Sequence, residues 1–531
     1  MKKTISCKKL LLGLSALAVC VLLVILWFMR QQTTPPDAYV YRSDEGGFVV
    51  RADGTAVPLP DSKHFYDGRF SPDGKYIYYL CRDSDIHVAD AGNLYRVEYQ
   101  KLTREPDHDR ALVQHISGRA DWSTLILADD GNTVVYLDSE DKLYAYQGES
   151  AVFIATNVSE AWVDGDRIAY IIQRITHRDA ILYKVSMHAL DRSVKVLGDY
   201  SFLYTKDLDT LLFTRPDGNG RISLYRLGLF GEARKISSRL SSFWGTDSFG
   251  EAYGHYYLEH TRTVERNGKP VKVYDLCRIL NGRSHIVAAD IVDYQATGAA
   301  GYIQYYTLRD YHESPSELRS LEHGYILDCR TERTIRYSRS AVKTLNGLPG
   351  AWRFVISDKT FYAVAESENG SSLWTAPIWS GRIGKLKKVD EGIRRFGLYD
   401  GVLYYSKCRT APLTNRTVYD RYVFRNGKST CLIEDADGAY LYEDGSWILH
   451  RLSNSAGRYN LHFINGDGND ILISEQVTAD WRISKDKILY IRNGKIYEFD
   501  GERSTLVAEN AEFVCAQNPM TAAFTWQSAY Y

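Results

Sequence analysis

The sequence predicts an all-β fold, specifically a β-propeller, from a strand pattern that recurs ten times and from 40 tyrosines among 531 residues. Aromatic side chains cover a pleated surface well and are enriched in strands. The clearest copy of the pattern is SPDGKYIYYLCRD, residues 71–83. Pro72-Asp73-Gly74 has the composition of a tight turn. Residues 76–81 then alternate between two faces that are both apolar, so the strand needs protein on both sides, as in a sandwich or between two propeller blades.

The repeat itself favours the propeller. Nine further segments share this short apolar or aromatic strand: 132–137, 167–172, 210–215, 254–259, 302–307, 360–365, 402–407, 446–451 and 487–492. Their spacing of roughly 35 to 60 residues brackets the ~40–45 residues of a four-stranded blade. Most copies continue into an aromatic-centred strand, a polar turn and a last apolar strand. A regular repeat of this kind overrides the three or four domains that the length alone suggests.

SPDGKYIYY followed by an LYR-type strand resembles the TolB-like, WD-repeat-like propeller repeats of bacterial envelope proteins. It also resembles the Tyr-rich repeats of Gram-positive membrane-anchored domains of unknown function. The resemblance covers most of residues 39–526. It implies a β-propeller fold and usually a binding role, and it brings no set of catalytic residues with it.

The N-terminus has the pattern of a membrane anchor. Four lysines precede an apolar run over residues 10–29, and twenty helical residues match the ~30 Å hydrocarbon core of a bilayer. The lysine bias places the N-terminus in the cytoplasm. A cleaved signal peptide is the alternative, but the run is longer than a usual signal core and no A-x-A site follows it. We therefore expect a single-pass cell-membrane protein with four segments: cytoplasmic tail 1–9, transmembrane anchor 10–29, linker 30–38 and extracytoplasmic propeller region 39–531.

The two ends of the propeller region look like parts of one unit. Residues 39–58 and 512–531 each hold strands without a complete repeat, so we expect them to pair in a composite blade. Ten internal units and one composite exceed the 4–8 blades typical of a propeller. One large ring and two abutting propellers are both compatible with this number, and we favour two.

The charge of the chain limits its possible partners. Residues 1–30 hold five basic and no acidic residues, which leaves 60 basic against 66 acidic residues outside. A nucleic-acid partner is therefore excluded, because its affinity needs a basic surface.

The cysteines outside the anchor are scattered over strand positions, which favours single buried small side chains over disulfides. Cys408 with Cys431 is the one pairing worth testing; the others are Cys81, Cys277, Cys329 and Cys515.

Motifs for catalysis and metal binding are missing from the sequence. It contains no H-E-x-x-H, G-x-S-x-G, phosphate loop or dinucleotide fingerprint. The acidic segments 82–90 and 106–109 are interpreted as solvated loops, and 216–220 and 465–470 as turns rather than calcium loops. Residues 314–324 have the signature of a short capped helix. We predict no cofactor and no metal.

The predicted function is therefore a ligand-binding or scaffold domain at the bacterial cell envelope. An envelope protein, a glycan or an anionic cell-wall polymer would be its partner. One alternative is an envelope enzyme that acts on a carbohydrate or peptide, with its active site assembled on the propeller face. Another is the sensing half of a regulatory pair. The sequence leaves the enzyme question open and favours a non-enzyme.

Long, charged connections follow the second strand of most units, and such loops share one face of a propeller, where function usually resides. A basic residue recurs near the end of that strand: Arg82, Arg174, Arg215, Arg309, Lys407, Arg451 and Arg492. Guanidinium groups suit carboxylate and phosphate ligands, so these residues predict a positive rim that accepts an anionic group. The alternative is that each pairs with a carboxylate close in sequence, such as Asp83, Asp179, Asp217 or Asp310.

Overall fold

A computed structural model describes most of the chain beyond residue 37. The described residues are 38–82, 91–129, 131–148, 150–164, 167–173, 178–185, 190–196, 202–204, 211–216, 221–227, 234–244, 255–266, 268–280, 283–296, 301–310, 324–346, 352–357, 359–367, 370–410, 417–442, 444–452, 457–465, 469–485, 487–517, 520 and 527–528. Among them, no helix is both long and apolar enough to span a membrane. The predicted tail, the anchor and the linker up to residue 37 lie outside the described residues, as does almost all of the predicted helix 314–324.

The strands form four-stranded antiparallel groups, which we number as blades. Blade 1 combines β42 (Ala511–Ala516) with β1 (Tyr39–Ser43), β2 (Gly46–Val50) and β3 (Ala56–Pro58). Blades 2 to 4 follow in chain order: β4 (Phe65–Phe70), β5 (Ile77–Cys81), β6 (Ala91–Val97) and β7 (Gln114–Asp121); β8 (Ile126–Leu127), β9 (Thr133–Leu137), β10 (Leu143–Gln147) and β11 (Ala151–Ala155); β12 (Val158–Asp164), β13 (Arg167–Gln173), β14 (Arg178–Val185) and β15 (Leu190–Val196).

Blades 5 to 7 share strands, because β19 (Arg234–Trp244) and β22 (Arg283–Ala296) each run from the outer edge of one blade into the inner edge of the next. The remaining strands of these blades are β16 (Phe202–Tyr204), β17 (Leu211–Pro216), β18 (Ile222–Leu227), β20 (His255–Arg266), β21 (Lys269–Leu280), β23 (Tyr302–Thr307), β24 (Tyr325–Asp328) and β25 (Arg333–Tyr337). Blade 8 is β26 (Trp352–Ser357), β27 (Thr360–Ser367), β28 (Gly370–Trp379) and β30 (Lys387–Glu391).

Blades 9 and 10 share β34 (Lys428–Leu441). Their other strands are β31 (Ile393–Tyr399), β32 (Val402–Thr410), β33 (Thr417–Arg425), β35 (Trp447–Leu452), β36 (Tyr459–Ile464) and β37 (Asp470–Val477), and blade 11 is β38 (Ala479–Ser484), β39 (Lys487–Arg492), β40 (Lys495–Phe499) and β41 (Ser504–Glu509). Short elements complete the described chain: β29 (Arg382–Ile383), β43 (Gln527–Ser528), α2 (Pro106–Ala111), α4 (Arg339–Asn346), η1 (Tyr99–Lys101), η2 (Trp122–Thr124) and η5 (Leu308–Asp310).

The described strands thus make eleven blades: five separate four-stranded sheets, four groups within a 15-stranded sheet and two within an 8-stranded sheet. The ten strand copies predicted from the sequence are the second strands of blades 2 to 11. The predicted pairing of the chain ends is also confirmed, since β42 pairs with β1 from Tyr39↔Ala516 to Ser43↔Ala511. The result is an all-β propeller architecture.

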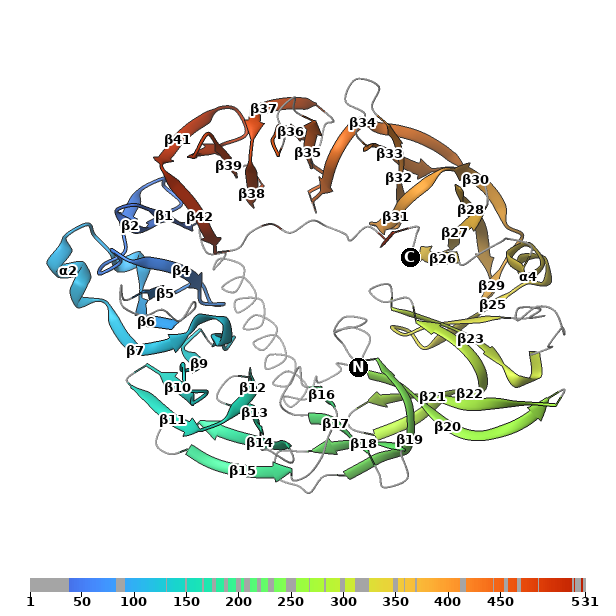
Figure 1. Ribbon diagram of the computed structural model, residues 1–531. Coiled ribbons are helices and arrows are strands. Elements are labelled where there is room, and N and C mark those ends of the chain that lie inside the picture. The colour runs from blue at the N-terminus through green and yellow to red at the C-terminus, as the bar shows by residue number, and fades with distance from the viewer. Residues whose placement is uncertain are drawn as a thin grey trace, which may run out of the picture.

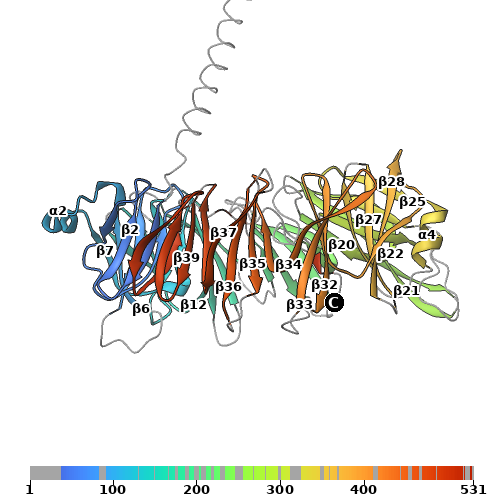
Figure 2. The ribbon, with the colours of Figure 1, turned by 90° about the horizontal axis from the view of Figure 1, so that it is seen from above.

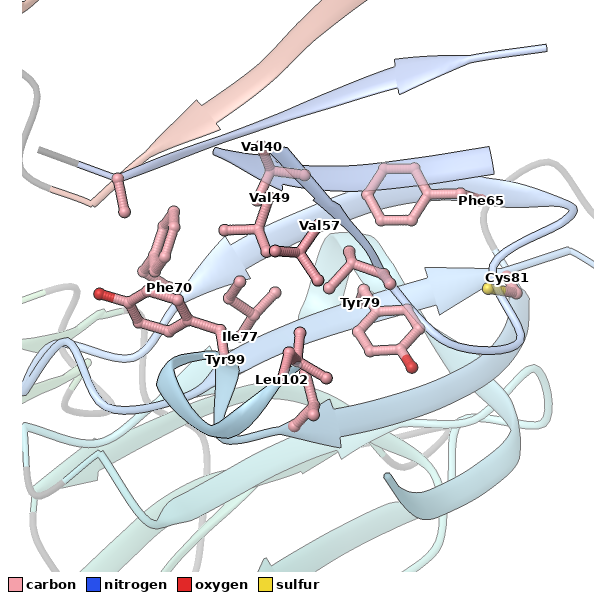
Figure 3. Packing of buried hydrophobic residues seen from close by; sticks show 13 residues of the cluster. Val40, Val49, Val57, Phe65, Phe70, Ile77, Tyr79, Cys81, Tyr99 and Leu102 are labelled. Carbon is pink, nitrogen blue, oxygen red and sulfur yellow. The ribbon is translucent and has the colours of Figure 1, made fainter. Parts of the chain in front are cut away.

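Figure 1 shows the blades in one circular series. Buried hydrophobic clusters lie between consecutive blades from 1 to 4 and from 5 to 11, and again between blade 11 and blade 1. In the first of these, shown in Figure 3, Val40 and Val49 of blade 1 face Ile77 and Tyr79 of blade 2. Burial of each such side chain stabilises the fold by about 1.5–3 kcal/mol. These clusters, together with the single circle of blades in Figure 1, define one ring, so our preference for two propellers was wrong.

Strand polarity gives the ring two faces, and Figure 2 shows the strands running between them. We call the face where second strands end the loop face; it carries the connections between second and third strands. The opposite face, which we call the turn face, carries the connections from first to second and from third to fourth strand. Ala38 leads into β1, a second strand, so the chain enters the ring at the turn face.

Two sequence interpretations need correction, whereas the preference for free cysteines over a Cys408–Cys431 disulfide is confirmed. Segment 106–109 is not a solvated loop: it opens α2, and the buried Asp109 carboxylate accepts hydrogen bonds from the Thr103 and Arg104 amides. Segment 259–270 was expected to be one of the long, charged connections after a second strand, but it is mostly strand, because β20 extends to Arg266 and β21 begins at Lys269. Cys408 and Cys431 lie on β32 and β34, on either side of β33, and both are free thiols.

Candidate binding face

Six of the seven predicted rim residues are described, and strand polarity places all six on the loop face. Arg174 lies outside the described residues. Arg82 follows β5, Arg309 lies in η5 after β23, and the other four lie on second strands: Arg215, Lys407, Arg451 and Arg492. Because they belong to different blades, they are distributed around the ring and are not brought together in one site.

Two of these cations are paired with carboxylates. Lys407 Nζ lies 2.6 Å from Asp390 Oδ1, and Arg451 Nη2 lies 2.8 Å from Asp470 Oδ2. Burial raises the pKa of the Asp390 carboxyl, but hydrogen bonds from Lys407 and Tyr405 outweigh it and leave the pKa below its ordinary value. The pairing alternative therefore holds for Lys407 and Arg451, although with other carboxylates than those close in sequence.

Three of the remaining four described rim residues are more available, whereas Arg82 is only partly exposed. The Arg82 guanidinium lies over the Tyr66 ring, 3.5 Å from its centroid. Arg215, Arg309 and Arg492 are exposed to solvent, in blades 5, 7 and 11. Whether these residues bind an anion stays a prediction.

A cluster that the sequence analysis missed lies between blades 10 and 11. His450 on β35 has its Nε2 atom 2.7 Å from Oδ1 of Asp480 on β38. Tyr459 donates a hydrogen bond of 2.5 Å to the same oxygen, and its ring stacks on His450 with centroids 3.9 Å apart. Gly438 lies opposite His450 and leaves room for the imidazole.

This cluster is enclosed, since the His450 and Asp480 side chains are only 18% and 8% exposed. Burial, together with the charge of Asp480, raises the pKa of the Tyr459 hydroxyl above its ordinary value, so that the phenol stays a hydrogen-bond donor. The buried Asp480 carboxylate, with His450 and Tyr459 beside it, therefore joins the sheets of blades 10 and 11. His450 was visible in the sequence as part of the predicted strand 446–451, but Asp480 comes from the next blade, and no local pattern links the two.

A small cavity of about 220 Å³ lies beside blade 2. Its walls include Arg96 and Gln114, and it also contains both Glu98 and Lys101, which form an ion pair of 2.8 Å. Arg96 is only 4% exposed and stacks between two rings, 4.3 Å from that of Tyr76 and 5.0 Å from that of Tyr146. The volume of this cavity is below the ~300–1,000 Å³ of typical ligand pockets.

Comparison with known proteins does not assign this chain to a family. No protein-family model and no curated protein matches this chain, so the resemblance to TolB-like repeats stays a prediction. Among solved structures, a eukaryotic initiation factor shares 9% identity with a TM-score of 0.34, covering 90% of this chain and 98% of that one. The β-propeller domain of the Trilobed protease from Pyrococcus furiosus shares 13% identity with a TM-score of 0.24, covering 71% and 99%.

A third solved structure, dipeptidyl peptidase 4 from Porphyromonas gingivalis, shares 11% identity with a TM-score of 0.34. The match covers 84% of this chain and 59% of that one. At such identities and TM-scores these comparisons carry no inference about function.

Proposed function

We propose that this chain is a membrane-anchored, extracytoplasmic β-propeller that acts as a binding or scaffold domain of the cell envelope and presents its loop face to a partner. The observation that carries the proposal is the set of long connections on the loop face, 82–91, 307–325, 410–417 and 452–459. The turn face carries one described connection of comparable length, 98–113, which holds η1 and α2. Elaborated loops on a rigid scaffold are where binding functions concentrate.

The point of entry supports the same orientation. The basic tail and the twenty-residue apolar run precede Ala38, and Ala38 enters at the turn face. A membrane anchor followed by a short linker therefore holds the turn face toward the bilayer. The loop face then points away from the membrane, toward the other components of the envelope.

For the ligand, we propose an anionic cell-wall polymer bound by the exposed rim residues Arg215, Arg309 and Arg492. Guanidinium forks pair well with phosphate and carboxylate groups. Lys407 and Arg451 contribute less, because their charges are already paired. We do not propose catalysis, because the ionisable cluster around His450 is enclosed between two sheets.

The test replaces Arg215, Arg309 and Arg492 by glutamine in the full chain and measures retention on immobilised poly(glycerol phosphate). We expect wild-type retention that weakens with salt, and loss of retention in the triple variant with an unchanged melting temperature. Arg234, Arg283 and Arg425 are exposed elsewhere on the ring, and their replacement by glutamine is the matched control. Equal loss in both variants, or retention in both, would reject the rim as the site.

A further inference from the structure

The most exposed large hydrophobic side chain in the described part of the chain is Trp379, at 75% exposure. It lies at the tip of the hairpin that joins β28 to β29 in blade 8. Tryptophan has a large apolar ring with one polar N–H group, which suits surfaces that are apolar at one end and wet at the other. An indole held in this position needs an explanation.

The hairpin holds Trp379 outward rigidly. Ser380 and Gly381 both have positive φ, 47° and 71°, which makes the tight turn that pairs Trp379 with Arg382. β29 also pairs in parallel with β25 of blade 7, where the Arg336 amide donates a hydrogen bond of 2.8 Å to the Gly381 carbonyl. Ile383, just after the turn, is fully buried. The exposure of Trp379 is therefore built into an anchored hairpin.

The surroundings of Trp379 are basic. Segment 377–388 holds four basic residues and no acidic one. Lys388 pairs with Glu391, whereas Arg382, Lys385 and Lys387 are exposed. Three more exposed basic residues lie on neighbouring connections of the same face: Arg330, Arg333 and Lys359.

The two described acidic residues on those neighbouring connections, Asp328 and Glu332, already have partners. Glu332 is held by Arg278 and by His285, whose Nε2 atom lies 3.3 Å from its carboxylate. The Asp328 carboxylate accepts hydrogen bonds from the Arg330 amide and the Thr331 hydroxyl. Among the described residues around the indole, exposed basic side chains thus outnumber exposed acidic ones.

The hairpin lies in the connection from β28, a third strand, to β30, a fourth strand, so it lies on the turn face, where Ala38 enters. Figure 1 shows β1 and the β28–β29 hairpin on opposite sides of the ring. Residues 30–37 of the predicted linker reach at most about 28 Å when extended, so an anchored ring keeps the turn face close to the bilayer. Two separate points of contact, one at each side, would hold that face parallel to the membrane.

We infer that the Trp379 hairpin is a second membrane contact, in which the indole enters the headgroup region and Arg382, Lys385 and Lys387 pair with anionic lipid phosphates. Tryptophan is enriched at membrane interfaces, and basic residues near an anionic surface strengthen attachment. The inference rests on the membrane anchor of the proposed function, and it adds how the ring is oriented.

The test uses the full chain in nanodiscs of three parts zwitterionic and one part anionic lipid, with and without bromine on the acyl chains. Bromine quenches indoles within the bilayer. The emission of Trp379 is obtained by subtracting the spectrum of the Trp379→Phe variant from that of the wild type. We expect a blue-shifted difference spectrum that is quenched by brominated lipid, with weaker quenching when Arg382, Lys385 and Lys387 are all glutamine.

Trp27 in the predicted anchor provides the matched control through Trp27→Phe. Quenching of Trp27 together with an unshifted, unquenched Trp379 would overturn this inference and leave the anchor intact. If neither indole is quenched, the anchor fails, and the proposed function and this inference fail with it. Quenching of Trp379 that is unchanged in the triple glutamine variant would overturn the role of the basic residues.

Discussion

Tyr78 shows how much of the role of one residue can be predicted from the sequence. The alternating pattern of 76–81 places it in a buried strand, and it is fully buried between blades 2 and 3. Its hydroxyl donates a hydrogen bond of 3.0 Å to the Gly131 carbonyl of the next blade. The burial was predictable from the strand pattern. The partner was not, because it is 53 residues away and meets Tyr78 only once the blades pack.

The burial of Tyr78 predicts an alkaline limit to stability. Desolvation raises the pKa of its hydroxyl to about 12, from an ordinary value of 10.0. The unfolded chain releases this proton near pH 10 while the folded chain keeps it, so stability is fully present below pH 10 and is lost as pH rises toward 12. We expect the free energy of unfolding, measured in urea, to fall over this window.

The Tyr78→Phe variant is the control for that prediction. It loses the hydrogen bond to Gly131, which costs roughly 1 kcal/mol near neutral pH. Its free energy of unfolding should then fall less steeply between pH 10 and pH 12 than that of the wild type. Equal slopes for the two proteins would show that Tyr78 does not contribute to the alkaline limit.

The candidate site was predictable to a similar extent. Strand ends and their basic residues follow from the repeat, and the structure places all six described rim residues on one face. Their ion-pair partners did not follow, because Asp390 belongs to the preceding blade and Asp470 lies two strands away from Arg451. Carboxylates that are close in sequence are a poor guide where hairpins bring together residues some twenty positions apart.

At the scale of elements, the tight turn predicted at Pro72-Asp73-Gly74 is present, and it contacts the equivalent turn of blade 3. Gly74 has a φ of 69°, and its amide donates a hydrogen bond of 2.8 Å to the Ser71 carbonyl. The long strands β19, β22 and β34 were not predicted as continuous. Their apolar pattern does not record that a strand leaves one sheet and joins the next at a register shift.

Gly131 lies in the equivalent turn of blade 3, against the Asp73 carboxylate. It has a φ of 67°, and a Cβ atom added there would overlap that carboxylate. Gly131→Ala should therefore destabilise the protein by more than the ~1–2 kcal/mol that positive φ alone costs. Gly427 has a similar φ of 79° with no atom within 4 Å, so Gly427→Ala isolates the backbone cost. Equal losses in urea unfolding would mean that the two turns do not constrain each other.

At the scale of the whole molecule, the number of blades followed from the repeat, whereas the single ring did not. Ring closure depends on contacts between blades 1 and 11, where Tyr39 and Tyr41 pack against Ile483 and Leu489. Trp481 lies against Phe513 of β42, with ring centroids 4.4 Å apart. The residues of blade 11 and β42 lie more than 400 positions after β1 in the chain. Local sequence patterns carry no information about contacts between segments so far apart.

The closing strand also predicts how the ring fails. Deleting residues 512–531 removes β43 and all but the first residue of β42, so β1 becomes an edge with unpaired backbone groups. Phe513, Val514 and Cys515 would no longer pack on the first and last blades. All three side chains are partly buried, so each contributes less than the ~1.5–3 kcal/mol of a fully buried large apolar side chain. We expect a clearly lower melting temperature and a broader thermal transition.

A shorter deletion separates closure from the tail that follows it. Beyond β42, the Gln517 amide bonds to the Ala38 carbonyl at 2.9 Å, and β43 pairs with β31 of blade 9 through Arg395↔Ser528 and Phe396↔Gln527. Of the contacts made by the described residues, deleting residues 526–531 removes only that of β43 and keeps β42, so the melting temperature should stay close to that of the wild type. If both deletions lowered it equally, the tail rather than β42 would hold the ring, and if neither did, closure by the chain ends would be wrong.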